Sequence, residues 1–252
     1  MNHVPRAALP FALVLAVASC SGSPPDDDPG RGGASSPAGA TTLRATLTTP
    51  TDIDLAWSAA PAEVDGWVLE FATEEGGPWT PLQYLPPEVT TFRHPDLMPR
   101  TPFHYRLRAF TGPASEPVEV ALPEGELTPE DEDTGHAWLA PVTREDATVP
   151  GHPVAAPDEA RPTDLEAAVK HANGIHFTWT DRSENEEGFL LESRVEGDGT
   201  FYGPIALLDP DVNSYGLITL PEEKHASYRI RAFTHGNASN TVTLTTGDED
   251  AA

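Results

Sequence analysis

Short runs in which apolar and polar residues alternate recur along the chain, separated by Pro, Gly and Asp. In the run GWVLEFA, Trp67, Leu69 and Phe71 fall on one face of a β-strand, because side chains of a strand point alternately to opposite faces. Val68 and Glu70 fall on the other face. We find no convincing helical pattern. The chain is therefore predicted to form short antiparallel strands whose apolar faces make a core.

This strand pattern occurs twice. YRLRAF begins at Tyr105 and YRIRAF at Tyr228, while GWVLE at Gly66 corresponds to GFLLE at Gly188. Further matched pairs are Trp57 and Trp179, Leu43 and Leu165, Ala45 and Ala167, Leu47 and Val169, Ile53 and Ile175, and Leu55 and Phe177. A register of this length indicates an internal duplication, two copies of one small domain.

The repeated unit has a tryptophan on its second strand, a Gly-aromatic-x-aliphatic-Glu third strand and a Tyr-x-aliphatic-x-Ala sixth strand. These residues are Trp57, Gly66, Trp67, Leu69, Glu70, Tyr105, Leu107 and Ala109 in the first copy, and Trp179, Gly188, Phe189, Leu191, Glu192, Tyr228, Ile230 and Ala232 in the second. The pattern resembles the fibronectin type III family. The resemblance covers about residues 41–123 and 162–246, and it implies an all-β protein with two tandem immunoglobulin-like antiparallel β-sandwiches. The family's corner tyrosine is replaced by Phe103 and Ala226, so neither copy has its hydroxyl hydrogen bond.

The third and sixth strands are neighbours in the fold that this resemblance implies. Glu70 is then expected near Arg106 or Arg108. The second copy repeats the arrangement with Glu192 and with Arg229 or Arg231. Cross-strand pairs of opposite charge contribute about 0.2–1 kcal/mol each, so a structural role is the default interpretation. The alternative is an exposed arginine stripe that binds acidic partners.

The first nineteen residues have the pattern of a secretory signal peptide, with a basic start and an apolar stretch that is too short to span a bilayer. They end in Val17-Ala18-Ser19-Cys20, which resembles the lipobox of bacterial lipoproteins. The resemblance implies cleavage before Cys20, a diacylglyceryl group on its sulfur and a membrane anchor. Ser21 favours the outer over the inner membrane. The alternative is an incidental thiol after an ordinary cleavage site.

Three segments lack apolar periodicity and are expected to be disordered. Residues 20–40 form a tether rich in Gly, Ser, Pro and Asp, residues 124–161 an acidic Pro-rich linker, and residues 247–252 an acidic tail. Trp138 and Leu139 interrupt the linker. They form either a local cluster that rests on a neighbouring domain or a docking motif for a partner, and the sequence does not choose between them.

Charge and motifs restrict the function. The net charge of -25 argues against nucleic acid, whose phosphates require a basic face, and against an anionic lipid surface. The chain has one cysteine and therefore no intramolecular disulfide. Gly-x-Ser-x-Gly, His-Glu-x-x-His and phosphate-binding glycine motifs are all missing from the sequence. We expect no catalytic residue, no bound cofactor and no enzyme activity.

Two acidic segments were considered as cation sites. Residues 209–213 begin like a calcium-binding EF-hand loop, but Ser214 and Leu220 stand where that loop requires glycine and glutamate. Residues 181–187 carry four carboxylates, for which an ordinary solvated turn is the expected role. His171 and His176, taken as one strand, would lie on opposite faces. The sequence therefore predicts no metal site.

Taken together, these patterns predict a bacterial cell-envelope lipoprotein without catalytic activity. Its two modules would bind a protein or polysaccharide in adhesion, and its contact with the membrane would be the lipid anchor alone. The alternative is a spacer or assembly subunit of an envelope complex that has no ligand of its own. A binding module should expose aromatic or charged side chains near its loops, and Trp79, Trp138 and Phe201 are the first candidates.

Overall fold

The structure is a computed structural model that describes residues 41–58, 63–125, 128, 136–196, 201–220 and 223–248. The predicted signal peptide, Cys20 and the tether lie outside the described residues, as does the acidic tail after Asp248. Within the described part, almost all regular structure is β-strand, which confirms the all-β fold class. No helix in this part of the chain is long and apolar enough to cross a bilayer.

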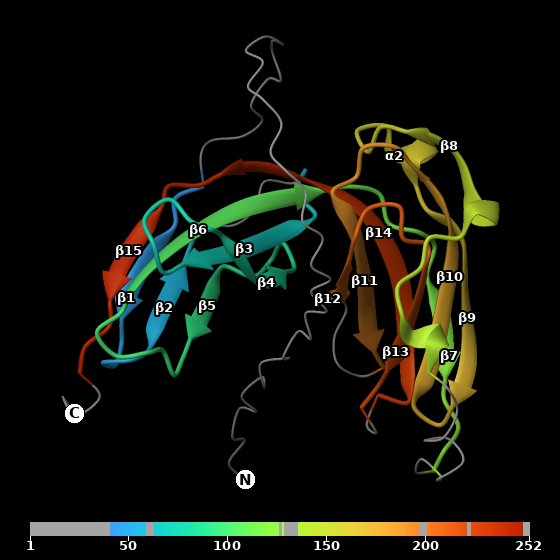
Figure 1. The fold of residues 1–252 in the computed structure, drawn as a ribbon, viewed down its shortest axis with the longest axis horizontal. Coiled ribbons are helices and arrows are strands. Elements are labelled where there is room, and N and C mark those ends of the chain that lie inside the picture. The colour runs from blue at the N-terminus through green and yellow to red at the C-terminus, as the bar shows by residue number, and fades with distance from the viewer. Residues whose placement is uncertain are drawn as a thin grey trace, which may run out of the picture.

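Each half of the molecule is a sandwich in which three strands pack on four, and in module 2 the linker strand β8 (Thr148–His152) adds a fourth strand to the smaller sheet (Figure 1). In module 1 these sheets are β1 (Arg44–Leu47), β2 (Ile53–Ala56) and β5 (Thr91–His94), packed on β4 (Thr80–Leu85), β3 (Gly66–Ala72), β6 (Pro102–Thr111) and β15 (Val242–Thr245). In module 2 they are β13 (Ser214–Ile218), β10 (Gly174–Ser183) and β9 (Thr163–His171), packed on β12 (Gly203–Leu208), β11 (Gly188–Val195), β14 (His225–Ala238) and β7 (Val118–Ala121). This three-plus-four arrangement is the expected pair of fibronectin type III-like sandwiches.

The two modules exchange their last strands. β7 follows β6 in the chain, but it pairs with β14 of module 2, with Val118 opposite Tyr228. β15 follows β14 and pairs with β6 of module 1, with Val242 opposite Tyr105. In Figure 1, β15 (red) accordingly lies beside the blue and green strands of module 1, and β7 (green) lies among the orange strands of module 2. The domain boundaries 41–123 and 162–246 group these two strands by chain order, and these boundaries stay a prediction.

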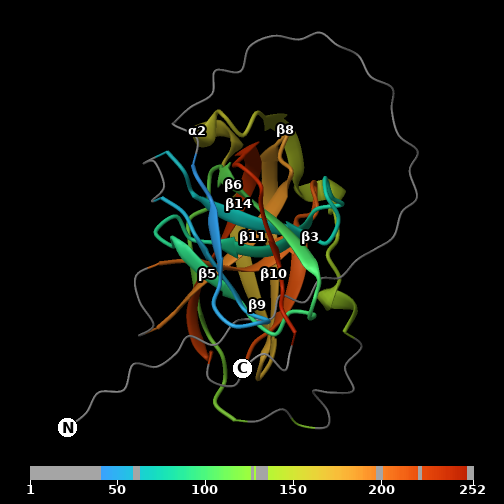
Figure 2. The same ribbon diagram turned by 90° about the vertical axis from the view of Figure 1, so that its left-hand side faces the viewer.

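β6 and β14 also pair with each other where they leave their own modules. Thr111 lies opposite Thr234 and Phe110 opposite His235, so the two four-stranded sheets join into one eight-stranded sheet. Figure 2, turned so that module 1 faces the viewer, shows the strands of module 1 in front of those of module 2. After β6 the chain crosses to module 2 at Gly112, where a Cβ would lie 2.0 Å from the Ala232 carbonyl oxygen. That approach requires glycine.

Each sandwich has the core that the alternation predicts. Trp67, Leu69 and Phe71 pack in module 1 with the buried Trp57. Trp179 is buried in the equivalent core of module 2. A third core lies between the modules and is made of Val68, Tyr84, Phe110, Leu190 and Phe233, with Leu207 packed against it. These six residues are three pairs of equivalent positions in the two repeats, so the junction is pseudo-twofold symmetric.

The linker packs against module 2 from residue 136 onward, although its composition predicts disorder. It contains the short helices η1 (Ala137–Leu139), η2 (Glu145–Ala147) and α2 (Pro157–Ala160), and the strand β8 (Thr148–His152), which pairs with β10 in parallel. Val142 forms an isolated bridge to Ser214. These residues are ordered because their backbone groups pair with those of module 2, as β8 does with β10 and Val142 with Ser214. Composition alone does not reveal such pairing.

Candidate functional site

An open cleft of about 870 Å³ lies where the two modules and the linker meet. We call it the inter-module cleft. Its walls come from residues 111–117, which cross between the modules, from the α2 region of the linker, and from the outer face of β11 and β14. Four of the 15 basic side chains of this acidic protein line it, Arg161, Arg194, Arg229 and Arg231. Glu63, Asp65 and Glu116 also line the cleft, so four arginines against three carboxylates give its lining a formal charge of +1, on a molecule with a net charge of -25.

Tyr202 provides an aromatic surface in the cleft. The guanidinium carbon of Arg229 lies 4.2 Å from its ring centroid, and that of Arg194 lies 4.9 Å away. Arginine stacks on an aromatic face through a cation–π interaction. Its N–H groups lie in the plane of the guanidinium group and can still donate hydrogen bonds. The Tyr202 hydroxyl is hydrogen-bonded to the Ser227 hydroxyl at 2.6 Å, which fixes the ring.

Arg231 ties the two modules together at the back of the cleft. Its side chain is buried and donates to Glu192 at 2.9 Å, to the Gly112 carbonyl at 2.5 Å and to Asp65 of module 1 at 2.8 Å. Asp65 in turn accepts a hydrogen bond from the Gly112 backbone N–H at 2.9 Å. Arg229 also donates to the buried Glu192. The predicted pairing of Glu192 with Arg229 or Arg231 is confirmed, and both arginines take part.

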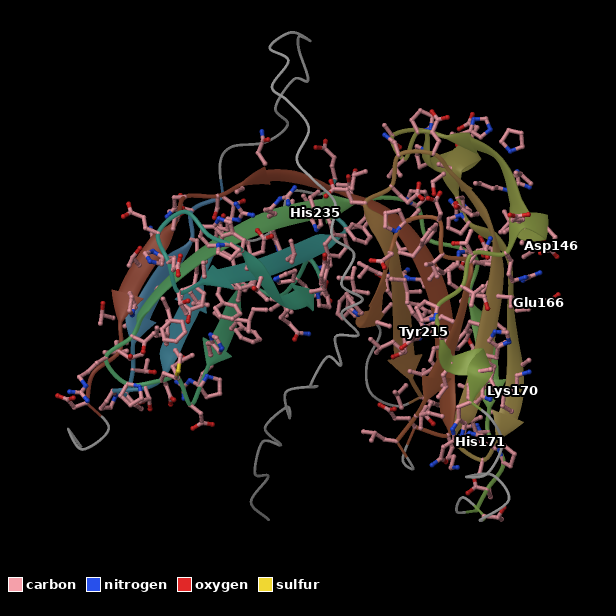
Figure 3. All side chains as sticks on the ribbon, viewed as in Figure 1. Asp146, Glu166, Lys170, His171, Tyr215 and His235 are labelled. Atoms are coloured by element: carbon pink, nitrogen blue, oxygen red, sulfur yellow. The ribbon has the colours of Figure 1, made fainter. Side chains whose placement is uncertain are left out.

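The symmetry-equivalent position in the other repeat is much more exposed. Arg108 donates to the Gly236 carbonyl at 3.1 Å and lies 4.0 Å from Glu187 of module 2. Glu187 accepts from the His235 ring at 2.7 Å, and Figure 3 shows His235 at the junction of the modules. Burial would raise the pKa of Glu187, but the hydrogen bonds from the His235 ring and backbone outweigh it and hold the pKa below its ordinary value.

The predicted ion pair of module 1 is also formed. Arg106 donates to the buried Glu70 at 2.5 Å, and its guanidinium carbon lies 4.4 Å from the centroid of the Trp79 ring. Each module thus holds an arginine between a buried glutamate and an aromatic ring. Trp79 is half-buried, whereas Phe201 is 62 % exposed.

Trp138 supports the interpretation of a local cluster on a neighbouring domain. Its ring contacts the rings of His171 and His176, with centroids 5.7 Å and 6.4 Å apart. The expectation that these two histidines face opposite ways was wrong, because β9 ends at His171 and a turn separates it from His176 on β10. Figure 3 shows His171 at the end of module 2 that lies away from the junction.

Sequence reasoning identified the arginines of β14 but not the cleft. Arg161 comes from the linker and Arg194 from the end of β11, and their approach depends on the way the linker folds back. Two features of the sequence pointed to the cleft, the repeated Arg-x-Arg strand and the aromatic residue Tyr202. What the arrangement offers is a set of fixed N–H donors beside a ring, which suits binding of carboxylate groups.

The chain is similar to some solved structures, at low sequence identity and low TM-score. No protein family profile and no curated protein sequence matches the chain. Among solved structures, a two-domain fibronectin type III segment of chicken tenascin is 15 % identical, covers 83 % of this chain and 100 % of its own, and has a TM-score of 0.26. A Fn3-like protein from Clostridium thermocellum is 24 % identical over 29 % of this chain and 77 % of its own, with a TM-score of 0.26. The pectate lyase PelI from Erwinia chrysanthemi is 20 % identical over 28 % of this chain, which spans 23 % of that enzyme, with a TM-score of 0.26.

Proposed function

We propose that this chain is a non-catalytic lipoprotein of the bacterial cell envelope that binds a carboxylate-bearing protein or polysaccharide in the inter-module cleft. The observation that carries the proposal is the stacking of Arg194 and Arg229 on Tyr202 within the cleft of an otherwise acidic molecule. Binding in adhesion is the role that suits paired fibronectin type III-like modules with such a surface.

Two arginines of the cleft are available to a ligand. The side chains of Arg161 and Arg194 are each 39 % exposed, and their partners Glu116 and Glu119 are 90 % and 74 % exposed. These pairs have N–O distances of 3.6 Å and 3.9 Å. Exposed ion pairs at such distances contribute little to stability. A ligand carboxylate can therefore replace either glutamate at small cost and gain the contact with the arginine.

The membrane anchor is the second part of the proposal. Val17-Ala18-Ser19-Cys20 at the end of an apolar leader supports lipidation of Cys20 and attachment through acyl chains, with Ser21 favouring the outer membrane. The Cys20→Ala chain should leave the membrane fraction and be recovered in soluble form. Recovery in the membrane pellet would contradict the anchor.

The soluble chain serves to test binding. We expect it to bind poly-glutamate or a polyuronate more tightly than neutral dextran, and to lose that binding as salt is raised, because the two arginines are exposed. Arg161→Ala combined with Arg194→Ala should weaken binding about tenfold or more. Arg93→Ala is the matched control, since Arg93 is an exposed, Asp54-paired arginine outside the cleft, and it should bind as wild type. Equal binding to dextran, or none to either acidic polymer at low salt, would contradict the proposed function.

A spacer or assembly subunit remains the second candidate function. The eight-stranded sheet and the buried core between the modules favour it, because they join the two sandwiches into one extended unit. A spacer needs no ligand, so absence of binding to both acidic polymers is the result that selects this function.

A further inference from the structure

Three carboxylates meet at one end of module 2. Asp181 lies near the end of β10, Glu186 in the loop that leads to β11, and Asp211 in the turn between β12 and β13. One oxygen of each lies within 4.8 Å of the others. The two acidic segments recognised in the sequence, residues 181–187 and 209–213, thus form a single cluster, which neither segment forms alone.

Two of these carboxylates are buried, and each has an oxygen without a partner. Asp181 is 1 % exposed and Glu186 is 7 % exposed. One oxygen of Asp181 accepts from the Ser183 backbone N–H at 3.0 Å and the Ser183 hydroxyl at 2.9 Å, and one oxygen of Glu186 accepts from the Asp211 backbone N–H at 3.2 Å. Asp181 Oδ2 and Glu186 Oε2 are buried and have no hydrogen-bond partner.

No basic side chain balances this buried negative charge in the described part of the chain. None of the ion pairs found there involves Asp181, Glu186 or Asp211. Buried carboxylates are normally paired or coordinate a metal, because an unpaired buried charge is costly.

We propose that Asp181, Glu186 and Asp211 bind a calcium ion. Carboxylate oxygens are the ligands of hard cations, and the cluster contains no cysteine or histidine that would favour zinc. Calcium takes oxygens at about 2.3–2.6 Å, so ligands on opposite sides of the ion lie about 4.6–5.2 Å apart. Oxygens within 4.8 Å of one another can share one such ion. Three carboxylates favour calcium, because magnesium keeps several waters and is usually bound through one or two carboxylates.

The cluster is open to solvent on the side of Asp211. The Asp211 side chain is exposed, so water can complete the coordination of the ion.

The ion would also lie beside the junction between the modules. Glu187 follows Glu186 directly in the chain, and it contacts His235 at 2.7 Å and Arg108 at 4.0 Å. The proposed ion therefore lies next to the loop residue that makes a contact between the modules.

The test is a calcium titration of the purified full chain after dialysis against a chelator. Isothermal titration calorimetry should show one calcium ion per chain, with magnesium binding at least about tenfold more weakly. The midpoint of thermal unfolding should rise by about 3–6 °C when calcium is tenfold above its Kd, because a ligand of the folded state stabilises it. No heat and no rise up to about 10 mM calcium, tenfold above the weakest extracellular calcium modules, would overturn the proposal.

Variants separate a specific site from general charge screening. Asp211→Asn should weaken calcium binding about tenfold or more and keep the turn, because asparagine tolerates the left-handed backbone of Asp211 (φ +62°). Asp209→Asn is the matched control, since Asp209 is exposed in the same turn and lies outside the cluster, and it should bind calcium as wild type. An equal loss in both variants would overturn the site.

Asp181→Asn distinguishes a calcium ligand from a carboxylate with a structural role alone, through the midpoint of thermal unfolding with and without calcium. The variant removes a buried charge, so its midpoint of thermal unfolding without calcium should be higher than that of wild type, while the rise on adding calcium should disappear. A calcium response that persists in Asp181→Asn, or equal affinities for calcium and magnesium in the wild-type chain, would contradict the proposed ligand set or the proposed ion.

Discussion

Leu190→Ala is expected to lower the free energy of unfolding by about 2–5 kcal/mol, as much as Leu191→Ala. The two residues are neighbours on β11 and both are fully buried, but they face opposite ways. Leu191 belongs to the core of module 2, whereas Leu190 belongs to the core between the modules with Val68 and Phe233. Removing either side chain leaves a cavity in a packed apolar cluster.

Urea unfolding followed by tryptophan fluorescence measures both variants against wild type. In a fibronectin type III-like sandwich standing alone, Leu190 would lie on the outer face of the sheet and face water. Its truncation would then cost no more than about 0.5 kcal/mol, as for other surface positions. A large loss for Leu191→Ala together with a negligible loss for Leu190→Ala would show that the modules do not pack through this face.

Arg231→Met should destabilise the protein by about 1.5–3 kcal/mol, because it removes a buried cation that donates hydrogen bonds to Glu192, Asp65 and the Gly112 carbonyl. Glu192 would stay buried with Arg229 as its one remaining cationic partner, and Asp65 and the Gly112 carbonyl would lose their contact with module 2. Methionine keeps most of the side-chain volume, so the effect reports mainly on charge and hydrogen bonding.

Arg108→Met is the control, since Arg108 occupies the equivalent position of the first repeat. The carboxylate paired with it, Glu187, is 4.0 Å away and 46 % exposed, so the loss of Arg108 should cost less than about 1 kcal/mol. Equal effects of the two substitutions, measured by urea unfolding, would contradict the asymmetry of the two halves of the junction.

The alternation of residues predicts the strands and the two module cores but not the core between them. In β3 it correctly separates Trp67 from Val68, yet nothing in one strand shows that the face of Val68 is buried as well. A signal was present at Phe110 and Phe233, large apolar residues that share a strand face with arginines. Strands that are apolar on both faces are typically covered on both faces.

The strand exchange could not be predicted, because duplication makes the two pairings chemically equivalent. β7 and β15 both follow a YR-x-RAF strand and pair with the same positions of that strand in either copy, as Val118 does with Tyr228 and Val242 with Tyr105. β7 and β15 would therefore pair with equivalent residues whether or not the strands are exchanged. The choice depends on the path of the crossing segments, where Gly112 permits close backbone contact.

The candidate sites were missed for a different reason. The inter-module cleft and the calcium cluster are assembled from loops and linker residues that are distant in sequence. Asp181 and Asp211 were each noted in an acidic segment, but their approach depends on the antiparallel pairing that brings the ends of β10 and β13 together. The spacing of residues along the chain does not predict such a contact.

The central claim is that the two repeats exchange their last strands, and engineered disulfides test it most directly. In a Cys20→Ser chain, Glu119→Cys combined with Ser227→Cys should cross-link on mild oxidation, because these residues face each other between β7 and β14. Without exchange, Glu119 would face His104, the residue equivalent to Ser227 in the first repeat. Mass spectrometry of proteolytic fragments should therefore find the disulfide in the 119/227 pair and not in a Glu119→Cys, His104→Cys chain. A disulfide that forms in the 119/104 chain and fails in the 119/227 chain would contradict the exchange.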